Sequence, residues 1–274
     1  MNYGGIELTG DKHDVEFLKK NADCIRSRAL HLPHLDQPIS LINYVRIAND
    51  IESRLRSVTA KNAAGKHLNP RVLDWGCGYG QMTWLLKRRS FNITSFDIGH
   101  DDAVLPDIPL CHTLQVTRTT HPTQLPFQEE TFEAVLSCGV LEHVDECSGE
   151  VGNERKSLTE IARVLTPNGR FLIYQLPQKA AWQEAVVRRL KLGYSHPRRY
   201  SAAEIELLLT EAGFRMVHLR RANLIPKNLT GMPNAIRKIY SVFGPALVLL
   251  DGFLCRIPLL NRIAGVLEIE AVKA

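Results

Sequence analysis

Apolar and polar residues follow three different patterns along this chain. Between residues 39 and 55 the apolar residues recur at near-helical spacing, which predicts a helix. From residue 71 onward, short apolar runs alternate with amphipathic stretches, as is typical of βαβ units with a mostly parallel sheet. Residues 232–264 break this alternation with a long, strongly apolar stretch. The pattern therefore predicts an α/β fold with a helical extension before it and an apolar helical insertion near its end.

The alternating region also predicts the order of the secondary structure. Seven strands are expected, at residues 71–74, 93–97, 113–117, 134–137, 171–175, 215–220 and 267–272. The helices expected between them include residues 82–87, 157–165 and 202–212. The second of these helices stops before a predicted turn at residues 167–169, Pro-Asn-Gly. Together these elements would form a Rossmann-like, seven-stranded, mostly parallel sheet with flanking helices.

This order divides the chain into four segments. Residues 1–69 are expected to form an N-terminal helical extension, and a linker begins at about residue 61. Residues 70–231 would form the main α/β domain, and residues 232–264 the apolar insertion. Residues 265–274 would then supply the last strand of the main sheet.

Composition narrows the class of protein. Of the 274 residues, 45% are hydrophobic and 23% are charged, as in an ordinary globular protein. A secretory signal has a basic stretch followed by an apolar one, and the first residues of this chain do not follow that order. We therefore expect a cytoplasmic protein. The six cysteines show neither a C-x-x-C pair nor a zinc-site spacing, and we interpret them as reduced thiols.

Charge is concentrated near the C-terminus. Between Phe214 and Arg262 there are eight basic residues and one acid, Asp251, which favours an anionic partner. The apolar run is interrupted by charges, Gly and Pro, whereas a spanning helix needs about 20 largely uncharged apolar residues. Residues 232–262 therefore fit a helix lying on an anionic membrane surface. An ordinary hydrophobic lid over the site is the alternative.

A glycine-rich loop follows the first predicted strand. Asp74 ends that strand, and Gly76, Gly78 and Gly80 follow at alternate positions before a helix. Glycines allow positive φ angles and close approach of a ligand to the backbone. A dinucleotide site would need G-x-G-x-x-G, but its third glycine position is Gln81. The loop thus predicts a ligand without a pyrophosphate, the alternative being a glycine turn with no ligand.

A second acid strengthens this interpretation. Asp97 ends the next predicted strand, about 20 residues after the glycines, where a carboxylate can accept both hydroxyls of a ribose. On its own, Asp97 would more simply be a helix cap or a solvated loop acid.

Five sequence blocks in order resemble the class I methyltransferases that use S-adenosylmethionine (SAM), especially the small-molecule branch with the ubiquinone and menaquinone methyltransferases. The blocks are VLDWGCGYG, SFDIG, LPFQEETFEAVLSCGVLEHV, LTEIARVLTPNGRFLIY and RRYSAAEIELLLTEAGF, between about residues 71 and 214. The resemblance implies SAM as the cofactor. It implies the following cofactor-binding residues: Asp74, Gly76, Cys77 and Gly78 at the methionine part, Asp97 and Ile98 at the ribose, and Ser137, Cys138 and Gly139 after the fourth strand.

The sequence departs from these relatives at two positions. Where they carry an acid that can bind the adenine amino group, this chain has His121. Quinone O-methyltransferases complete a metal site with a Glu three residues before the Glu of the Leu-Glu-His motif, and that position is Gly139 here. The resemblance therefore predicts no obligatory metal.

Candidates for acid–base chemistry follow the fourth strand and lie in a later loop. Glu142 and His143 would lie at the carboxyl end of the sheet, where ligands bind, and a histidine suits general-base work. His196 belongs to a loop that lies beside the acceptor pocket in relatives. The alternative for each histidine is a packing or capping role. Arg198 and Arg199 could pair with an acceptor anion, but such a pair is more often solvated.

Three functions follow from the sequence. The leading one is methylation of a small-molecule or lipid-linked acceptor, such as a glycan, isoprenoid or quinone-like molecule. The second is a nucleic-acid methyltransferase. The basic C-terminal third favours this function, but the sequence lacks an N/D-P-P-Y motif and a Pro-Cys nucleophile motif. The third is a non-catalytic binding or scaffold protein with the same fold.

Overall fold

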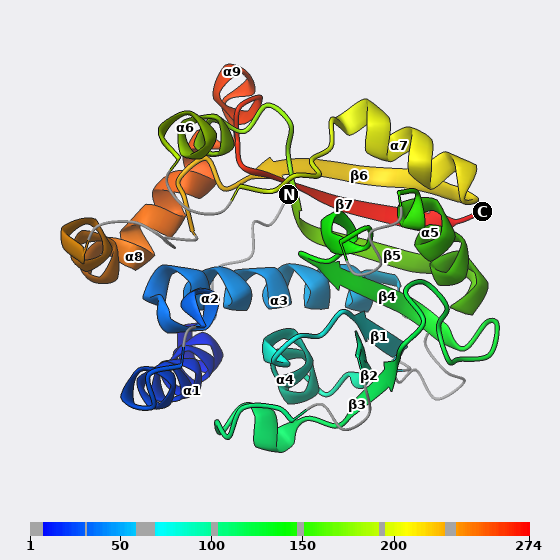
Figure 1. Ribbon diagram of the computed structural model, residues 1–274, viewed down its shortest axis with the longest axis horizontal. Helices are drawn as coiled ribbons and strands as arrows, with labels where there is room; N and C mark the ends of the chain where they lie inside the picture. Colours follow the sequence, from blue (N-terminus) through cyan, green and yellow to red (C-terminus); the bar gives the residue numbers. More distant parts are fainter. Residues whose placement is uncertain are drawn as a thin grey trace.

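The computed structural model describes residues 8–30, 32–58, 69–99, 104–146, 151–191, 195–227 and 234–274. Its centre is one seven-stranded sheet in the order β3-β2-β1-β4-β5-β7-β6, in which β7 alone runs antiparallel to its neighbours (Figure 1). The strands are β1 Arg71–Trp75, β2 Asn92–Ile98, β3 Val116–Thr119, β4 Phe132–Cys138, β5 Leu165–Pro177, β6 Phe214–Ala222 and β7 Val266–Lys273. The predicted fold class is confirmed.

Two hydrophobic cores lie on opposite faces of this sheet, because successive side chains of a strand point to opposite faces. Val72 and Leu136 join the core under the first helices, whereas Leu73 and Val135 join the core under α5 and α7. The helices are α1 Leu8–Ser27, α2 Pro33–Asp36, α3 Pro38–Val58, α4 Gln81–Arg88, α5 Asn153–Val164, α6 Trp182–Leu190, α7 Ala202–Glu211, α8 Asn234–Leu254 and α9 Pro258–Asn261. The helical extension and the helical insertion are both present.

Several predicted boundaries are wrong. The strand expected at residues 171–175 begins at Leu165, so residues 167–169, predicted as a turn, belong to β5. The third strand begins at Val116, not at residue 113, because Cys111–Thr113 form a 3-10 turn. The helix expected at residues 157–165 begins at Asn153 instead. Its first turn is stabilised from outside the helix, since the Asp145 carboxylate accepts the backbone N–H groups of Gly152 and Asn153 at 3.3 and 2.9 Å.

Helix α8 packs on α3 and away from the sheet (Figure 1). Its acid Asp251 is buried, pairs with Lys227 at 2.6 Å and accepts the backbone N–H of Ile225 at 2.7 Å. The apolar residues on its other side are exposed to solvent. Among the described residues, no helix is long and apolar enough to span a bilayer.

Some sequence predictions fall on positions outside the described residues. These are residues 61–68 of the linker, residues 232–233 of the insertion, and Cys147. The five cysteines that the structure does describe are free thiols.

Candidate active site

The glycine loop lies at the carboxyl ends of β1 and β4, where the chain order of the sheet reverses and open α/β folds bind ligands. The backbone N–H groups of Gly76 and Cys77 both donate to Phe96 O at 2.9 Å, so the loop is fixed to β2. Gly76 and Gly78 have φ angles of 73° and 52°, in the left-handed region. A Cβ at Gly76 would lie 2.5 Å from a Val140 methyl, whereas a Cβ at Gly78 would meet nothing within 4 Å. The loop therefore needs glycine at Gly76 and leaves open space at Gly78.

Asp97 connects this loop to the end of β2. One carboxylate oxygen accepts the N–H of Gly78 at 2.7 Å, and the other accepts the N–H of Ile98 at 2.8 Å. A carboxylate has about four acceptor positions, so each oxygen keeps capacity for a further donor. Asp97 is therefore oriented in advance for a pair of ligand hydroxyls.

Asp74 lies beneath the loop. It is buried and accepts a hydrogen bond from the Thr83 hydroxyl at 2.6 Å, and Thr83 also contacts the Ser95 hydroxyl at 2.9 Å. Burial raises the pKa of Asp74 to about 6, although the Thr83 hydrogen bond opposes this shift. Sequence reasoning missed Thr83 and Ser95, which hold the Asp74 carboxylate in place.

A cavity of about 250 Å³ runs from this loop towards β4. It is lined by Trp75, Gly76, Phe96, Asp97, Ile98, His121, Pro122, Thr123, Gly139, Val140, His143 and Val144. The cavity thus brings together five predicted site residues, from Gly76 to His143, that are up to 67 positions apart in the sequence (143 − 76 = 67). Its lining combines a few polar groups with apolar side chains, as small-molecule sites do.

The other predicted cofactor residues lie around the cavity and outside its lining. Ser137 is fully buried, and its hydroxyl has no hydrogen-bond partner among the described residues. Cys77 is buried, and Cys138 packs against the core under the first helices. Burial raises the pKa of both thiols, so neither is suited to act as a thiolate.

The side chain of His121, at the position where relatives carry an acid, is held by defined hydrogen bonds. Its Nδ1 accepts the backbone N–H groups of Thr123 and Gln124 at 3.3 and 2.9 Å, and the ring lines the cavity. The side chain thus organises the turn after β3, in the same cavity lining as Asp97.

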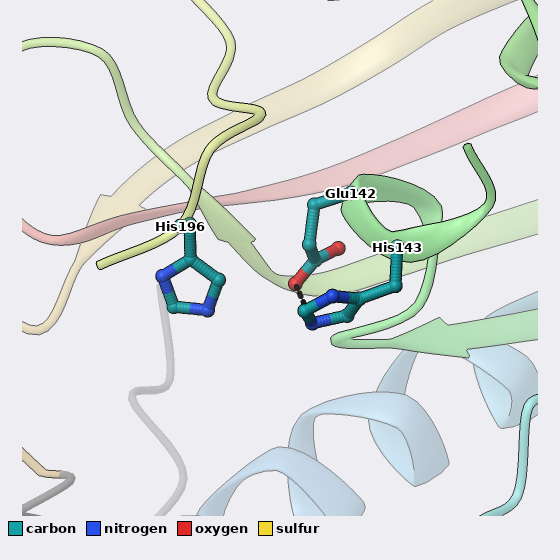
Figure 2. Close-up of side chains that lie close together, drawn as sticks. All are labelled: Glu142, His143 and His196. Carbon is teal, nitrogen blue, oxygen red and sulfur yellow. Dashed lines mark ion pairs between the residues drawn. The ribbon is translucent and has the colours of Figure 1, made fainter. Parts of the chain in front are cut away.

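The predicted acid–base residues lie close together (Figure 2), and of the three His143 lines the cavity. Glu142 and His143 lie in the 3-10 turn Leu141–His143 after β4, and His196 lies in the loop before α7. Glu142 Oε1 is 3.9 Å from His143 Nε2, and the two imidazole centroids are 5.7 Å apart. Burial raises the pKa of Glu142 to about 7, and its Oε2 has no hydrogen-bond partner among the described residues.

Each imidazole is held by a carboxylate that sequence reasoning missed. His143 Nδ1 is 3.0 Å from Glu146 Oε2, and His196 Nδ1 is 2.8 Å from Glu184 Oε1. Glu184 also accepts the Ser195 hydroxyl at 2.9 Å. Burial alone would lower the pKa of His196, but the hydrogen bond and charge of Glu184 outweigh burial and raise it. The acid at i+3 from His143 was the one sequence signal for such a partner.

Neighbouring residues of this cluster make contacts within the protein that stabilise its loops. Arg198 pairs with Glu154 at 2.9 Å and stacks over the Tyr200 ring, so its guanidinium is already occupied. Tyr200 is buried and donates to Leu141 O at 3.3 Å. These contacts fix the His196 loop against the 3-10 turn that carries Glu142 and His143.

Comparison with known proteins agrees with this geometry. The model of a family described as methyltransferase domain matches residues 47–219, more than half of the chain. A demethylmenaquinone methyltransferase from Tropheryma whipplei is 27% identical over 204 residues, with 72% of this chain and 73% of that protein covered. The O-methyltransferase rstn1 of Aspergillus nomiae is 25% identical over 178 residues, with 63% of this chain and 72% of that protein covered.

A solved structure shares the fold. The crystal structure of the [4+2]-cyclase SpnF matches with a TM-score of 0.50 at 18% identity, covering 84% of this chain and 80% of that one. At this identity the match shows the fold alone.

The chain belongs to the methyltransferase domain family. It is a SAM-dependent methyltransferase, and SAM is its cofactor. The glycine loop fits that cofactor, because Gly78 borders open space and Asp97 keeps acceptor capacity for the ribose.

Proposed function

We propose that the enzyme transfers the methyl group of SAM to a small, apolar, lipid-linked acceptor at an anionic membrane surface in the cytoplasm. The observation that carries the proposal is the single cavity that joins Asp97 of the cofactor loop to His143 of the acid–base cluster. A donor and an acceptor in that cavity would lie side by side. Methyl transfer needs little more than such alignment, exclusion of water and, for some acceptors, removal of a proton.

Each part of the chain has a task in this proposal. Bound SAM supplies an activated methyl group on its sulfonium. Gly76, Gly78 and Asp97 position the cofactor, and the apolar walls Val140 and Val144 exclude water from the cavity. The cluster of Glu142, His143 and His196 faces the acceptor, and His143 is the residue we propose to accept its proton. Glu146 holds the His143 ring in the required orientation.

Relatives support a small acceptor. Two relatives are a demethylmenaquinone methyltransferase and an O-methyltransferase. An isoprenoid or quinone-like acceptor would suit the apolar walls of the cavity, because apolar surface removed from water stabilises binding by about 25 cal/mol per Å².

The surface formed by α6, α8 and α9 supports the proposed contact with a membrane. Seven large apolar residues of α8 are exposed: Ile236, Ile239, Val242, Phe243, Leu249, Leu250 and Phe253. Helix α6 adds Val186 and Leu190, and α9 adds Leu259, at the same end of the molecule (Figure 1). Many exposed apolar residues on helices at one end of a molecule are typical of an interaction site.

The charges on this surface have one sign. Exposed basic residues on or next to these helices are Arg188, Arg189, Lys191, Lys238, Arg256 and Arg262. The two acids of the same helices are turned inward, Glu184 towards His196 and Asp251 towards Lys227. Apolar burial and attraction to anionic lipid would therefore act together.

Two experiments test the proposal. Purified enzyme is incubated with methyl-labelled SAM and either membrane or cytosolic extract, and the labelled products are identified. We expect label in a lipid-soluble small molecule from the membrane extract. Label in nucleic acid would contradict the proposed acceptor, and no labelled product from any extract would favour a non-catalytic protein. Sedimentation with vesicles tests the surface: binding should need anionic lipid and weaken at high salt.

A further inference from the structure

Three metal-ligating side chains converge beside the cavity, and one of them, His143, lines it. Glu142, His143 and His196 each offer one ligand atom, and these atoms all lie within 4.8 Å of one another. Figure 2 shows the Glu142 carboxylate and both imidazoles directed towards the same space. Two segments of the chain supply them, so the grouping is a product of the fold and not of local sequence.

The surroundings of the two histidines are those of metal ligands. A metal-bound histidine almost always donates its second ring N–H to a carboxylate or carbonyl, which fixes the tautomer and ring orientation. His143 contacts the Glu146 carboxylate, and His196 the Glu184 carboxylate, in both cases through Nδ1. The Nε2 atom is therefore the metal-binding nitrogen of each ring.

Glu142 is the independent observation that points to a ligand. Its side chain is 2% exposed, and Oε2 is buried with no hydrogen-bond partner among the described residues. A buried polar atom that lacks a partner is costly, and native structures rarely retain one without a function. A cation at Oε1, the oxygen that faces His143, would give this buried carboxylate a partner, and Oε2 would gain one if both oxygens shared the cation.

We propose that Glu142, His143 and His196 bind a first-row divalent cation such as Zn²⁺ or Mn²⁺. One carboxylate oxygen and two imidazole nitrogens leave coordination positions open, as catalytic metal sites require. Imidazole favours these metals over Mg²⁺ and Ca²⁺, which prefer oxygen ligands. The expectation that Gly139 excludes a metal considered only the sequence next to Glu142, whereas the fold supplies His196 from a later loop.

The cluster must tighten to hold a cation. Ligand atoms around a tetrahedral Zn²⁺ lie about 3.3 Å apart, since the bonds are about 2.0–2.1 Å long. Glu142 Oε1 and His143 Nε2 are 3.9 Å apart, so these two atoms need to approach by roughly half an ångström. Side-chain rotation in the 3-10 turn and in the His196 loop would supply this movement.

The role of the cation rests on the proposed function, whereas its binding does not. A bound cation lowers the pKa of a hydroxyl that it contacts. In the metal-bound enzyme it would thus promote proton loss from the acceptor, and His143 would act as a ligand instead of a base.

Calorimetry on the untagged, chelator-treated full chain tests the inference, with Mn²⁺, Zn²⁺ and Mg²⁺ as probes. We expect one Mn²⁺ or Zn²⁺ per chain and weaker binding of Mg²⁺. Glu142→Gln, His143→Ala and His196→Ala should each weaken Mn²⁺ binding at least tenfold, and Glu184→Gln by about 10- to 100-fold. His112→Ala is the matched control, because His112 also contacts a carboxylate, Asp107, but lies elsewhere on the surface.

Two further readouts keep the test decisive. The visible spectrum of bound Co²⁺ distinguishes nitrogen and oxygen ligands from the free cysteine thiols, and the wild type should show no thiolate band. SAM affinity measured on the same samples separates the two proposals: intact SAM binding without any cation would overturn this inference alone. Equal Mn²⁺ affinity in the wild type and the three ligand variants would also overturn it.

Discussion

The proposed cofactor half and the proposed acceptor half of the site are built in different ways. The cofactor half comes from β1 and β2, adjacent parallel strands whose carboxyl ends place the glycine loop beside Asp97. The acceptor half comes from a 3-10 turn after β4 and from a loop before α7, joined through Glu184 of α6. Sheet register fixes the first half, whereas side-chain contacts between loops fix the second. The first half is therefore suited to a constant cofactor and the second to an acceptor that differs between relatives.

We expect the largest loss of SAM binding from a substitution at Gly76, where the cofactor half has the least space for a side chain. Gly76→Val puts a branched side chain at a φ of 73° and within 2.5 Å of Val140. We expect SAM binding to fall by more than about 100-fold and turnover with it, because backbone strain and steric overlap act together. Equilibrium dialysis with labelled SAM measures the loss. Gly252→Val is the control, since a Cβ there meets nothing within 4 Å.

A change in the acceptor half should separate the two halves. His143→Ala should lower turnover by about 100-fold or more and leave SAM affinity within about twofold of wild type, since proton transfer and not cofactor binding is affected. Steady-state rates and SAM titrations on one preparation measure both quantities. Near-normal turnover in this variant would contradict a role for His143 in proton removal.

Asp97→Ala tests the ribose contact without steric overlap. Loss of the carboxylate removes its hydrogen bonds to the ligand and frees the N–H groups of Gly78 and Ile98. SAM affinity should fall by about 10- to 100-fold, as expected for hydrogen bonds to a charged group. Asp23→Ala, which removes a surface aspartate paired with Arg26, should leave the affinity unchanged. A binding curve identical to wild type for Asp97→Ala would remove Asp97 from the site.

The proposed membrane surface lies outside both halves and should be separable from them. Replacing Phe243 and Phe253 together with Ser should weaken binding to anionic vesicles by about tenfold or more, since each buried phenyl ring contributes about 1.5–3 kcal/mol. Sedimentation measures this, and SAM affinity should not change. Leu207→Ser on α7 is the control, because Leu207 is 56% exposed on a different surface. If the wild-type protein does not bind vesicles under any condition, α8 is a lid or a binding surface for another partner.

The smallest effect expected is a pH dependence of the cofactor half. Burial raises the pKa of Asp74 to about 6, and a nearby SAM ammonium group would favour the charged carboxylate and lower that pKa. Protons therefore compete with SAM, and affinity should fall as the pH drops through about 6, by less than tenfold per pH unit. Asp74→Asn should remove this dependence between pH 5 and 7 in calorimetric titrations.

The same contrast explains how much the sequence could predict. The number and order of the seven strands were predictable, because short apolar runs that alternate with amphipathic stretches indicate a mostly parallel sheet. Their ends were less predictable, since β3 and β5 each end two residues beyond the predicted strand. Helix α6 was missed because it is short, nine residues, and buries none of its residues fully, although its apolar residues recur at helical spacing. Glu184 was missed with it, since its contact with His196 depends on how α6 and the later loop pack together. The exposed apolar side of α8 was suggested by composition, but only the structure shows that Asp251 is turned inward.

One calorimetric experiment tests the central claim that two separable halves form one methyltransferase site. SAM is titrated into wild type, Gly76→Val and His143→Ala under the same conditions, with folding of each checked by circular dichroism. We predict one SAM per chain with equal affinity for wild type and His143→Ala, and no detectable binding to folded Gly76→Val. Absence of binding to wild type, or equal binding to all three proteins, would contradict the account.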